Sequence, residues 1–413
     1  MERIEEKRKN NQVLLLNIVL KSTIFPTHIR HRRMKVLTED VVMVKRFAVV
    51  VLTLGIFSYE MSAQVTTSAV PFLLIAPNSR ASGMGEAGAA LADDVWAQFW
   101  NPAGYAFQHG SEVALSHANW LPGFGLSDLW IAHTVYKQYI EDLDGTISGG
   151  FTYLNLGEFI QTGPTGPEEI GRFKGYELAL TAGYGTKVLD ELGVGVNARF
   201  IHSRLAPFGT DQEKGRGVAS GLSFDLGLMY RPNSVVIPFT DMDLGKALSI
   251  GVNLSNVGPN LTYIDKAQAD PLPMNFRLGF AYHVIQSEYN NLTYILDFSK
   301  LLVRRNSKGK VDPFYKSLFY SWVDKPFRQE LRDIVTGTGF EYWYGSPRLI
   351  ALRIGYFYED PQYGNRKFMT YGAGLRYDVY AFDFSYIDAF EDKHPLGETL
   401  RFTLMMSWEG SPF

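Results

Sequence analysis

Nine charged residues stand among alternating apolar residues and are the residues of this chain best placed to do chemistry. They are Arg199, Arg277, Arg353, Arg376, Arg401, Glu177, Asp225, Asp297 and Asp383. On extended strands these side chains would share the polar face. They could line a polar conduit, or they could form ion pairs with one another or with another segment. Because an unpaired buried charge is costly, we expect ion pairs.

Patterns that would indicate catalysis are weak. The histidines His117, His133, His202 and His283 fall in different stretches, and no G-x-S-x-G motif occurs. His202 and Ser203 are adjacent, so a strand would direct their side chains to opposite faces. The enzymatic alternative left open is a lipid hydrolase, which needs a Ser–His pair within hydrogen-bonding reach. We expect no catalytic residues.

Composition excludes several other kinds of site. The 413 residues carry a formal net charge of −3, with 14% aromatic residues, 39 glycines and no cysteine. No metal-ligand spacing or phosphate-binding glycine loop occurs, so we expect no metal and no cofactor. The near-neutral charge gives no reason to expect nucleic-acid binding. The sequence has no run of eighteen apolar residues, so no membrane-spanning helix is predicted.

A two-residue alternation recurs along the chain and predicts strands. In residues 274–283, Met274, Phe276, Leu278, Phe280 and Tyr282 alternate with small, polar or charged residues. A tilted membrane-spanning strand takes about 9–11 residues. An inward arginine is tolerable in a barrel whose lumen is polar. About fourteen such segments over residues 111–413 predict an all-β fold, an antiparallel transmembrane β-barrel.

Loop lengths support the same interpretation. Links after odd-numbered strands are predicted to be long, at residues 157–174, 203–216, 257–271, 301–335, 359–366 and 389–398. The other links are mostly short, and residues 231–246 are an exception. Transmembrane barrels have short periplasmic turns and longer outer loops, whereas a β-sandwich has no reason to sort its loops in this way. Aromatic residues at strand ends, such as Tyr176, Tyr230 and Trp408, predict interfacial girdles.

The N-terminal residues are predicted to be processed. Basic residues 44–46, the apolar residues 47–57 and the small residues near Ala63 are typical of a signal peptide over residues 43–63, cleaved after Ala63. A buried core helix is the alternative. Residues 1–42 are interpreted as an upstream start-site artefact or an unstructured extension, with translation beginning at Met43 or Met34.

Residues 64–110 lack sustained alternation and are predicted to form a hatch in the barrel lumen. Prolines interrupt this segment, and residues 93–99 are predicted to form a short helical turn. The motif Asn101, Pro102, Ala103 and Gly104 reads as a turn. A segment of this length without its own core must pack on something, and the lumen offers a surface.

One long loop is predicted to contain a helix. Asp324 is placed as its N-cap, Pro326 follows early, and Phe327, Leu331 and Ile334 form one apolar stripe. This helix could cover its own barrel or face a partner.

Several motifs, in order along the chain, resemble those of the PorV family, outer-membrane proteins of the type IX secretion system of Bacteroidetes. The motifs occupy residues 67–73, 75–80, 84–85, 100–103, 254–258, 274–279, 296–302, 355–360, 382–386, 394–396 and 399–402. The resemblance spans the chain after the signal peptide. It departs from the family only in the extension before Met43 and in the tail 409–413.

This resemblance implies a fourteen-stranded barrel of the fatty-acid-transporter type with an N-terminal hatch, located in the cell outer membrane and without catalytic activity. It implies that the protein receives the C-terminal domains of cargo from the type IX translocon. It further implies delivery to an attachment complex with the PorU-type sortase, which links cargo to lipopolysaccharide. The alternative is an outer-membrane transporter of hydrophobic small molecules such as fatty acids.

Overall fold

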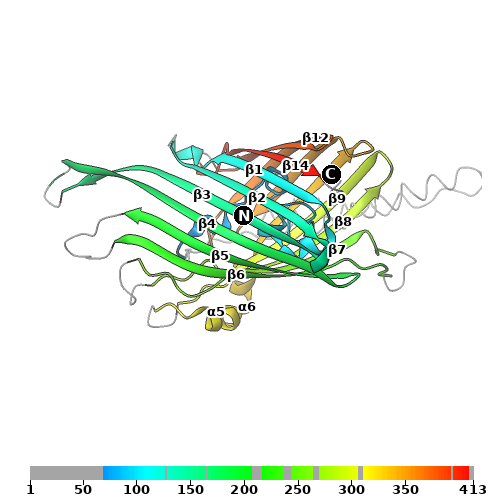
Figure 1. Cartoon of the computed structure of the whole chain (residues 1–413). Coiled ribbons are helices and arrows are strands. Elements are labelled where there is room, and N and C mark those ends of the chain that lie inside the picture. The colour runs from blue at the N-terminus through cyan, green and yellow to red at the C-terminus, as the bar shows by residue number, and fades with distance from the viewer. Residues whose placement is uncertain are drawn as a thin grey trace, which may run out of the picture. The chain divides into compact units, whose positions relative to one another are not determined.

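The protein forms a closed antiparallel barrel of fourteen strands (Figure 1). The structure, a computed structural model, describes residues 68–125, 128–163, 166, 168–206, 216–236, 243–263, 269–305, 310–391 and 394–408. The strands are β1 Ser111–Asn119, β2 Trp130–Ile140, β3 Gly145–Thr162, β4 Glu169–Leu189, β5 Leu192–Ala206, β6 Gly217–Tyr230, β7 Leu248–Val257, β8 Asn275–Gln286, β9 Asn290–Leu301, β10 Val335–Tyr344, β11 Ile350–Tyr358, β12 Lys367–Tyr377, β13 Tyr380–Ala389 and β14 Leu400–Trp408.

The first and last strands close the wall. β1 pairs with β14 from Ser111 opposite Trp408 to Ala118 opposite Arg401, and every other strand pairs with its neighbours in sequence. Closure leaves the sheet without an unpaired edge strand, as a β-structure in a bilayer requires. The predicted fold class, a fourteen-stranded antiparallel transmembrane β-barrel, is confirmed.

The alternation of side chains divides the wall into two faces. On β4, Leu180 is 51% exposed on the outer face, while its inward neighbour Ala179 is buried. Near the long loops, His117, Trp130, Tyr153, Tyr176 and His202 contact one another in turn, with ring centroids 5.4–5.9 Å apart. At the opposite end, the rings of Tyr136 and Trp408 stack 6.1 Å apart. These two aromatic belts bound an apolar band, as in membrane-embedded barrels.

Links at one end are short, at residues 141–144, 190–191, 287–289, 345–349 and 378–379, and the predicted long exception after β6 is present. The prediction of a loop over residues 157–174 is wrong for most of that range. There β3 and β4 continue as a hairpin, in which Phe159 pairs with Phe173 and their rings stack 5.4 Å apart. Cross-strand pairing of this kind stabilises a ladder beyond the wall.

The long link between β9 and β10 contains two helices, α5 (Phe314–Tyr320) and α6 (Phe327–Arg332). The sequence predicted only the second. The prediction of Asp324 as its N-cap is wrong, because Pro326 occupies that position without a side-chain cap. Ile334 lies beyond the last helical residue. No helix in the described ranges is long and apolar enough to span a membrane.

The N-terminal part of the described chain, residues 68–110, is here named the luminal segment. It contains the short helices η1 (Pro71–Leu74), α3 (Ser79–Ser82), α4 (Ala97–Trp100) and η2 (Pro102–Phe107). Two further 3₁₀ turns, η3 (Pro122–Phe124) and η4 (Glu141–Leu143), lie in barrel links. Within the luminal segment, η2 contacts β4, β5 and β6, and α3 contacts β12, β13 and β14. A segment that touches both sides of a closed wall lies inside it. The predictions for residues 1–63 concern residues outside the described part of the chain.

The apolar band predicts a depth-dependent response to charge. Leu180→Arg, midway along β4 between Tyr176 and Tyr184, should lower the free energy of unfolding by about 2–4 kcal/mol. Ser220→Arg, on β6 beside His202 at the outer belt, should cost no more than about 1 kcal/mol. Urea titration of both variants in lipid vesicles measures the difference, and equal costs would contradict the membrane placement.

Candidate functional site

A network of ion pairs joins the luminal segment to the wall on the β10–β13 side. Arg353 donates to Glu341 at 2.8 Å and to Asp383 at 2.7 Å, and Arg376 donates to the second oxygen of Asp383 at 2.8 Å. Arg80 of the luminal segment completes the network, since it donates two hydrogen bonds to Glu341, at 2.8 and 2.7 Å. The wall therefore presents one carboxylate, Glu341, that pairs with a cation of the luminal segment.

Arg80 also binds within its own segment. Its Nη1 lies 2.5 Å from Asp93 and 3.0 Å from Asp94. The side chain is thus surrounded by three carboxylates while it is almost fully buried. A buried charge is stable in such a site only when its partners are all in place.

A second group of contacts lies on the opposite side of the lumen. Arg199 of β5 pairs with both oxygens of Asp225, at 3.1 and 2.7 Å, and also donates to Asn256. Asp297 of β9, the strand next to β10, accepts the backbone N–H groups of Gly88 and Ala89, at 2.8 and 2.9 Å. On the β5 side, the Asn197 amide donates to the Gln98 carbonyl of the luminal segment at 2.7 Å. The loops of the luminal segment are therefore hydrogen-bonded to the wall on this side too.

The remaining predicted charges have other partners. Arg277 lies over the ring of Trp100, 4.5 Å from its centroid. Arg401 donates to Ser82 Oγ at 2.5 Å. Glu177 accepts a hydrogen bond from Ser203 at 2.7 Å. Each of the nine predicted residues thus contacts either the luminal segment or an adjacent strand.

The motif Asn101–Gly104 forms a turn pressed against β5, β6 and β7. The Asn101 amide donates to the carbonyls of Ala89 and Leu228, at 3.0 and 2.9 Å, and its oxygen accepts from Ala103 N–H. A Cβ atom on Gly227 would collide with the Asn101 side chain. Glycine on the wall therefore permits this close approach.

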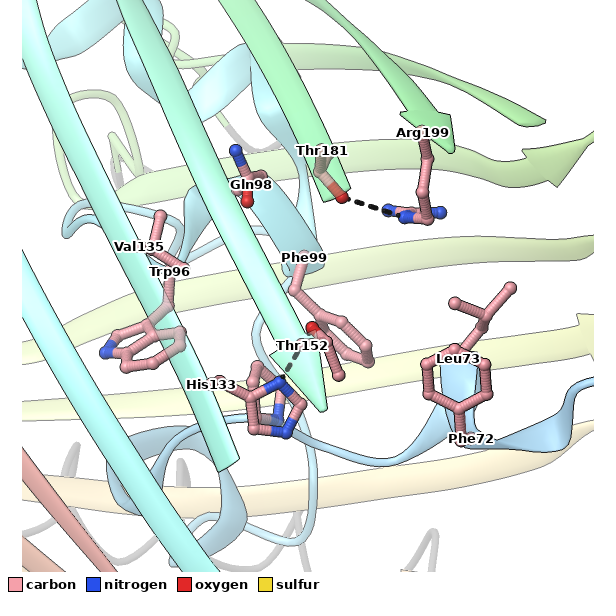
Figure 2. A pocket seen from close by; sticks show the side chains of 11 residues that line it. Phe72, Leu73, Trp96, Gln98, Phe99, His133, Val135, Thr152, Thr181 and Arg199 are labelled. Carbon is pink, nitrogen blue, oxygen red and sulfur yellow. Dashed lines mark hydrogen bonds between the residues drawn. The ribbon is translucent and has the colours of Figure 1, made fainter. Parts of the chain in front are cut away.

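The lumen retains a small cavity of about 30 Å³ (Figure 2). Apolar lining comes from Phe72, Leu73, Trp96 and Phe99 of the luminal segment. The wall contributes polar side chains in pairs: His133 with Thr152, 3.1 Å apart, and Arg199 with Thr181, 3.1 Å apart. The cavity is thus a mixed polar and apolar space.

The loop helix α6 is fixed at the rim by charge. Glu330 pairs with Lys300 of β9, Lys325 lies 2.7 Å from Asp333, and Arg332 lies 2.9 Å from Asp360. Phe327 is 75% exposed and Leu331 is 52% exposed. This apolar stripe therefore does not cover its own barrel.

The described residues contain no group of three acidic or histidine side chains arranged to hold a metal. A Ser–His contact does occur, because His202 Nδ1 lies 2.8 Å from Ser220 Oγ on the outer face. No carboxylate within the described ranges hydrogen-bonds to His202 to orient it. The contact therefore lacks the third group of a hydrolytic triad.

The family model described as "Type IX secretion system protein PorV" matches residues 58–308. The chain belongs to the PorV family. It is accordingly an outer-membrane component of the type IX secretion system, and it associates with that system. No curated protein sequence matches the chain.

Solved structures with a similar fold include two toluene transporters. TbuX of Ralstonia pickettii is 13% identical with a TM-score of 0.42, over 81% of this chain and 99% of that one. TodX of Pseudomonas putida is 13% identical with a TM-score of 0.44, over 84% and 99%. A Pseudomonas aeruginosa FadL homologue is 13% identical with a TM-score of 0.41, over 80% and 97%.

Sequence patterns missed part of this site. Arg80, Asp93 and Asp94 lie in a segment without alternation, so no periodicity marked them as inward-facing. Glu341 lies on β10, a strand whose alternation was weak. Glu341 and Trp343 are two residues apart, and this spacing was the signal that could have placed Glu341 on the inner face of the strand.

Removal of the Arg80 side chain should weaken the attachment of the luminal segment to the wall. Arg80→Ala leaves Glu341 and Asp93 without this partner, and breaking a buried ion pair costs about 3–5 kcal/mol. We expect a lower free energy of unfolding and new protease cleavage within residues 68–110. Arg172→Ala, which removes an exposed pair with Glu169, is the matched control and should change little. Equal effects of both variants would contradict the role of the network.

Acid should release α6 from the rim. Burial alone would raise the pKa of Glu330, but hydrogen bonds from Lys300 and the Lys325 backbone N–H hold that pKa below its ordinary value. A carboxyl with a lowered folded-state pKa stabilises the fold at neutral pH, and this contribution is lost as the pH falls through the ordinary glutamate pKa toward the lowered one. Hydrogen exchange over residues 314–334, corrected for intrinsic rates, should increase in acid. Glu330→Gln should remove this pH dependence, and an unchanged profile would contradict the assignment.

Proposed function

We propose that the protein binds the C-terminal domain of secreted cargo at its extracellular side and delivers it to the sortase and attachment complex of the type IX system. Membership of the PorV family supports this proposal. The lumen supports it too, since Arg80, Asn101 and Asp297 tie the luminal segment to the wall. A folded cargo domain would not pass through such a lumen. We therefore propose that cargo binds to the outer surface of the protein.

The observation that carries the proposal is the apolar exposure on the long loops. Phe327 and Leu331 are exposed on α6, and Ile160 and Ile170 are 57% and 62% exposed on the β3–β4 hairpin. Both links start from the strand ends opposite the short turns. Exposed apolar side chains on a rigid rim are suited to a protein partner.

The partners in this proposal are the type IX translocon, cargo C-terminal domains, a PorU-type sortase with other attachment-complex subunits, and outer-membrane lipid or lipopolysaccharide. Membership of the family supports this set of partners, and the loops supply a surface for them. We propose a binding role without catalysis, because the His202–Ser220 contact has no orienting acid in the described part of the chain.

Uptake of hydrophobic small molecules is the second candidate. It requires a continuous apolar route through the lumen. The cavity of Figure 2 has one polar side, formed by His133, Thr152, Thr181 and Arg199. This mixed lining supports the uptake hypothesis less than the binding hypothesis.

Loss of the exposed stripe should impair cargo delivery. In cells carrying Phe327→Ser with Leu331→Ser, we expect cargo to accumulate with its C-terminal domain uncleaved, as in a gene deletion. Tyr289→Ser is the matched control, because Tyr289 is 49% exposed at a short turn on the opposite end. Immunoblotting of cargo in membrane and surface fractions measures the outcome. Normal surface attachment of cargo in the deletion strain would refute the proposal. Normal attachment in the stripe variant alone would show that the Phe327–Leu331 stripe is not the cargo-binding surface.

A further inference from the structure

A groove runs along the outside of the wall beneath helix α5. Its floor is the outer face of β5 to β8, including Leu226, Leu254 and Phe276, and its roof is Leu318, Phe319 and Trp322. Its volume is about 660 Å³. Figure 1 shows α5 and α6 outside the wall, on the side of β6. The groove is therefore separate from the lumen.

Helix α5 is held over this wall by specific contacts. The ring of Trp322 packs edge-on against Phe276 of β8, with centroids 5.3 Å apart. The Lys300 ammonium lies 5.4 Å from the same indole. Ser317 of α5 and Ser321 at its C-terminal end are buried, so the helix has a fixed orientation. The roof is thus a formed part of the structure.

The depth of the groove places it in the bilayer. Its floor residues on β6 are Leu226 and Leu228, which lie between Tyr230 at the short-turn end and Ser220 beside the outer aromatic belt. These leucines are about half exposed on the outer face. The solvent around this part of the wall is therefore lipid hydrocarbon.

The lining offers an occupant nothing to hydrogen-bond. Every lining residue is apolar or glycine. The strands of the floor pair with each other, with Leu228 opposite Val252 and Leu254 opposite Phe276, so their backbone groups are used in the ladder. The Trp322 indole N–H already donates to the Leu318 carbonyl at 3.1 Å. A polypeptide edge would leave its own polar groups unpaired here, whereas a hydrocarbon chain has none.

We propose that this groove holds an acyl chain of an outer-membrane lipid, clamped between the wall and α5. This inference depends on the membrane placement of the barrel and is independent of cargo delivery.

Native mass spectrometry of the full chain tests the proposal. The protein, purified in a mild detergent and mixed with dimyristoylphosphatidylethanolamine, should retain one lipid as collision energy rises. Leu254→Trp, which fills the floor, should lose that lipid-bound species. Leu352→Trp places the same ring on the lipid-facing wall of β11, outside the groove, and should retain it.

Folding is checked by migration on a gel before and after boiling. If Leu254→Trp does not fold, Phe319→Gln serves instead, because Phe319 is 70% exposed and its loss should weaken only the roof. Equal lipid retention by all folded variants would overturn the proposal. The proposal would also be overturned if the protein retained a co-purified polypeptide in place of lipid and the groove variants released that polypeptide.

Discussion

A bilayer core offers no hydrogen bonds to a polypeptide, and this constraint accounts for the architecture of the wall. Each strand must therefore find partners on both sides, and the pairing of β1 with β14 meets that demand around the ring. The same constraint sorts the side chains. Leucines such as Leu180 and Leu404 face outward between two aromatic belts, and polar residues turn inward.

Inward polar residues create a second requirement, which the luminal segment meets. Asp383, Glu341 and Arg353 are almost fully buried, and each would be costly without its partners. Arg80 brings positive charge to this cluster, while the N–H groups of Gly88 and Ala89 bind Asp297. The segment and the wall are thus complementary.

Much of the fold could be predicted from the two-residue alternation, because its physical cause, one lipid face and one polar face, acts along each strand. It also predicted that charges such as Arg199 and Asp383 face inward. It could not predict Arg80 or Asp94, whose positions depend on contacts with residues far away in sequence. Helix α5 was not predicted, because its apolar residues pack on the outside of the wall, against strands far away in sequence. The hairpin of β3 and β4 was missed because its ladder extends beyond the membrane band.

The luminal segment closes the barrel by complementing its inner charges. Electrical recording in planar bilayers tests this closure most directly. The full chain should show no steady pore conductance, and a variant lacking residues 68–107 should show stepwise conductance through a water-filled lumen. A large, stable conductance of the full chain, or none from the folded deletion variant, would contradict the account.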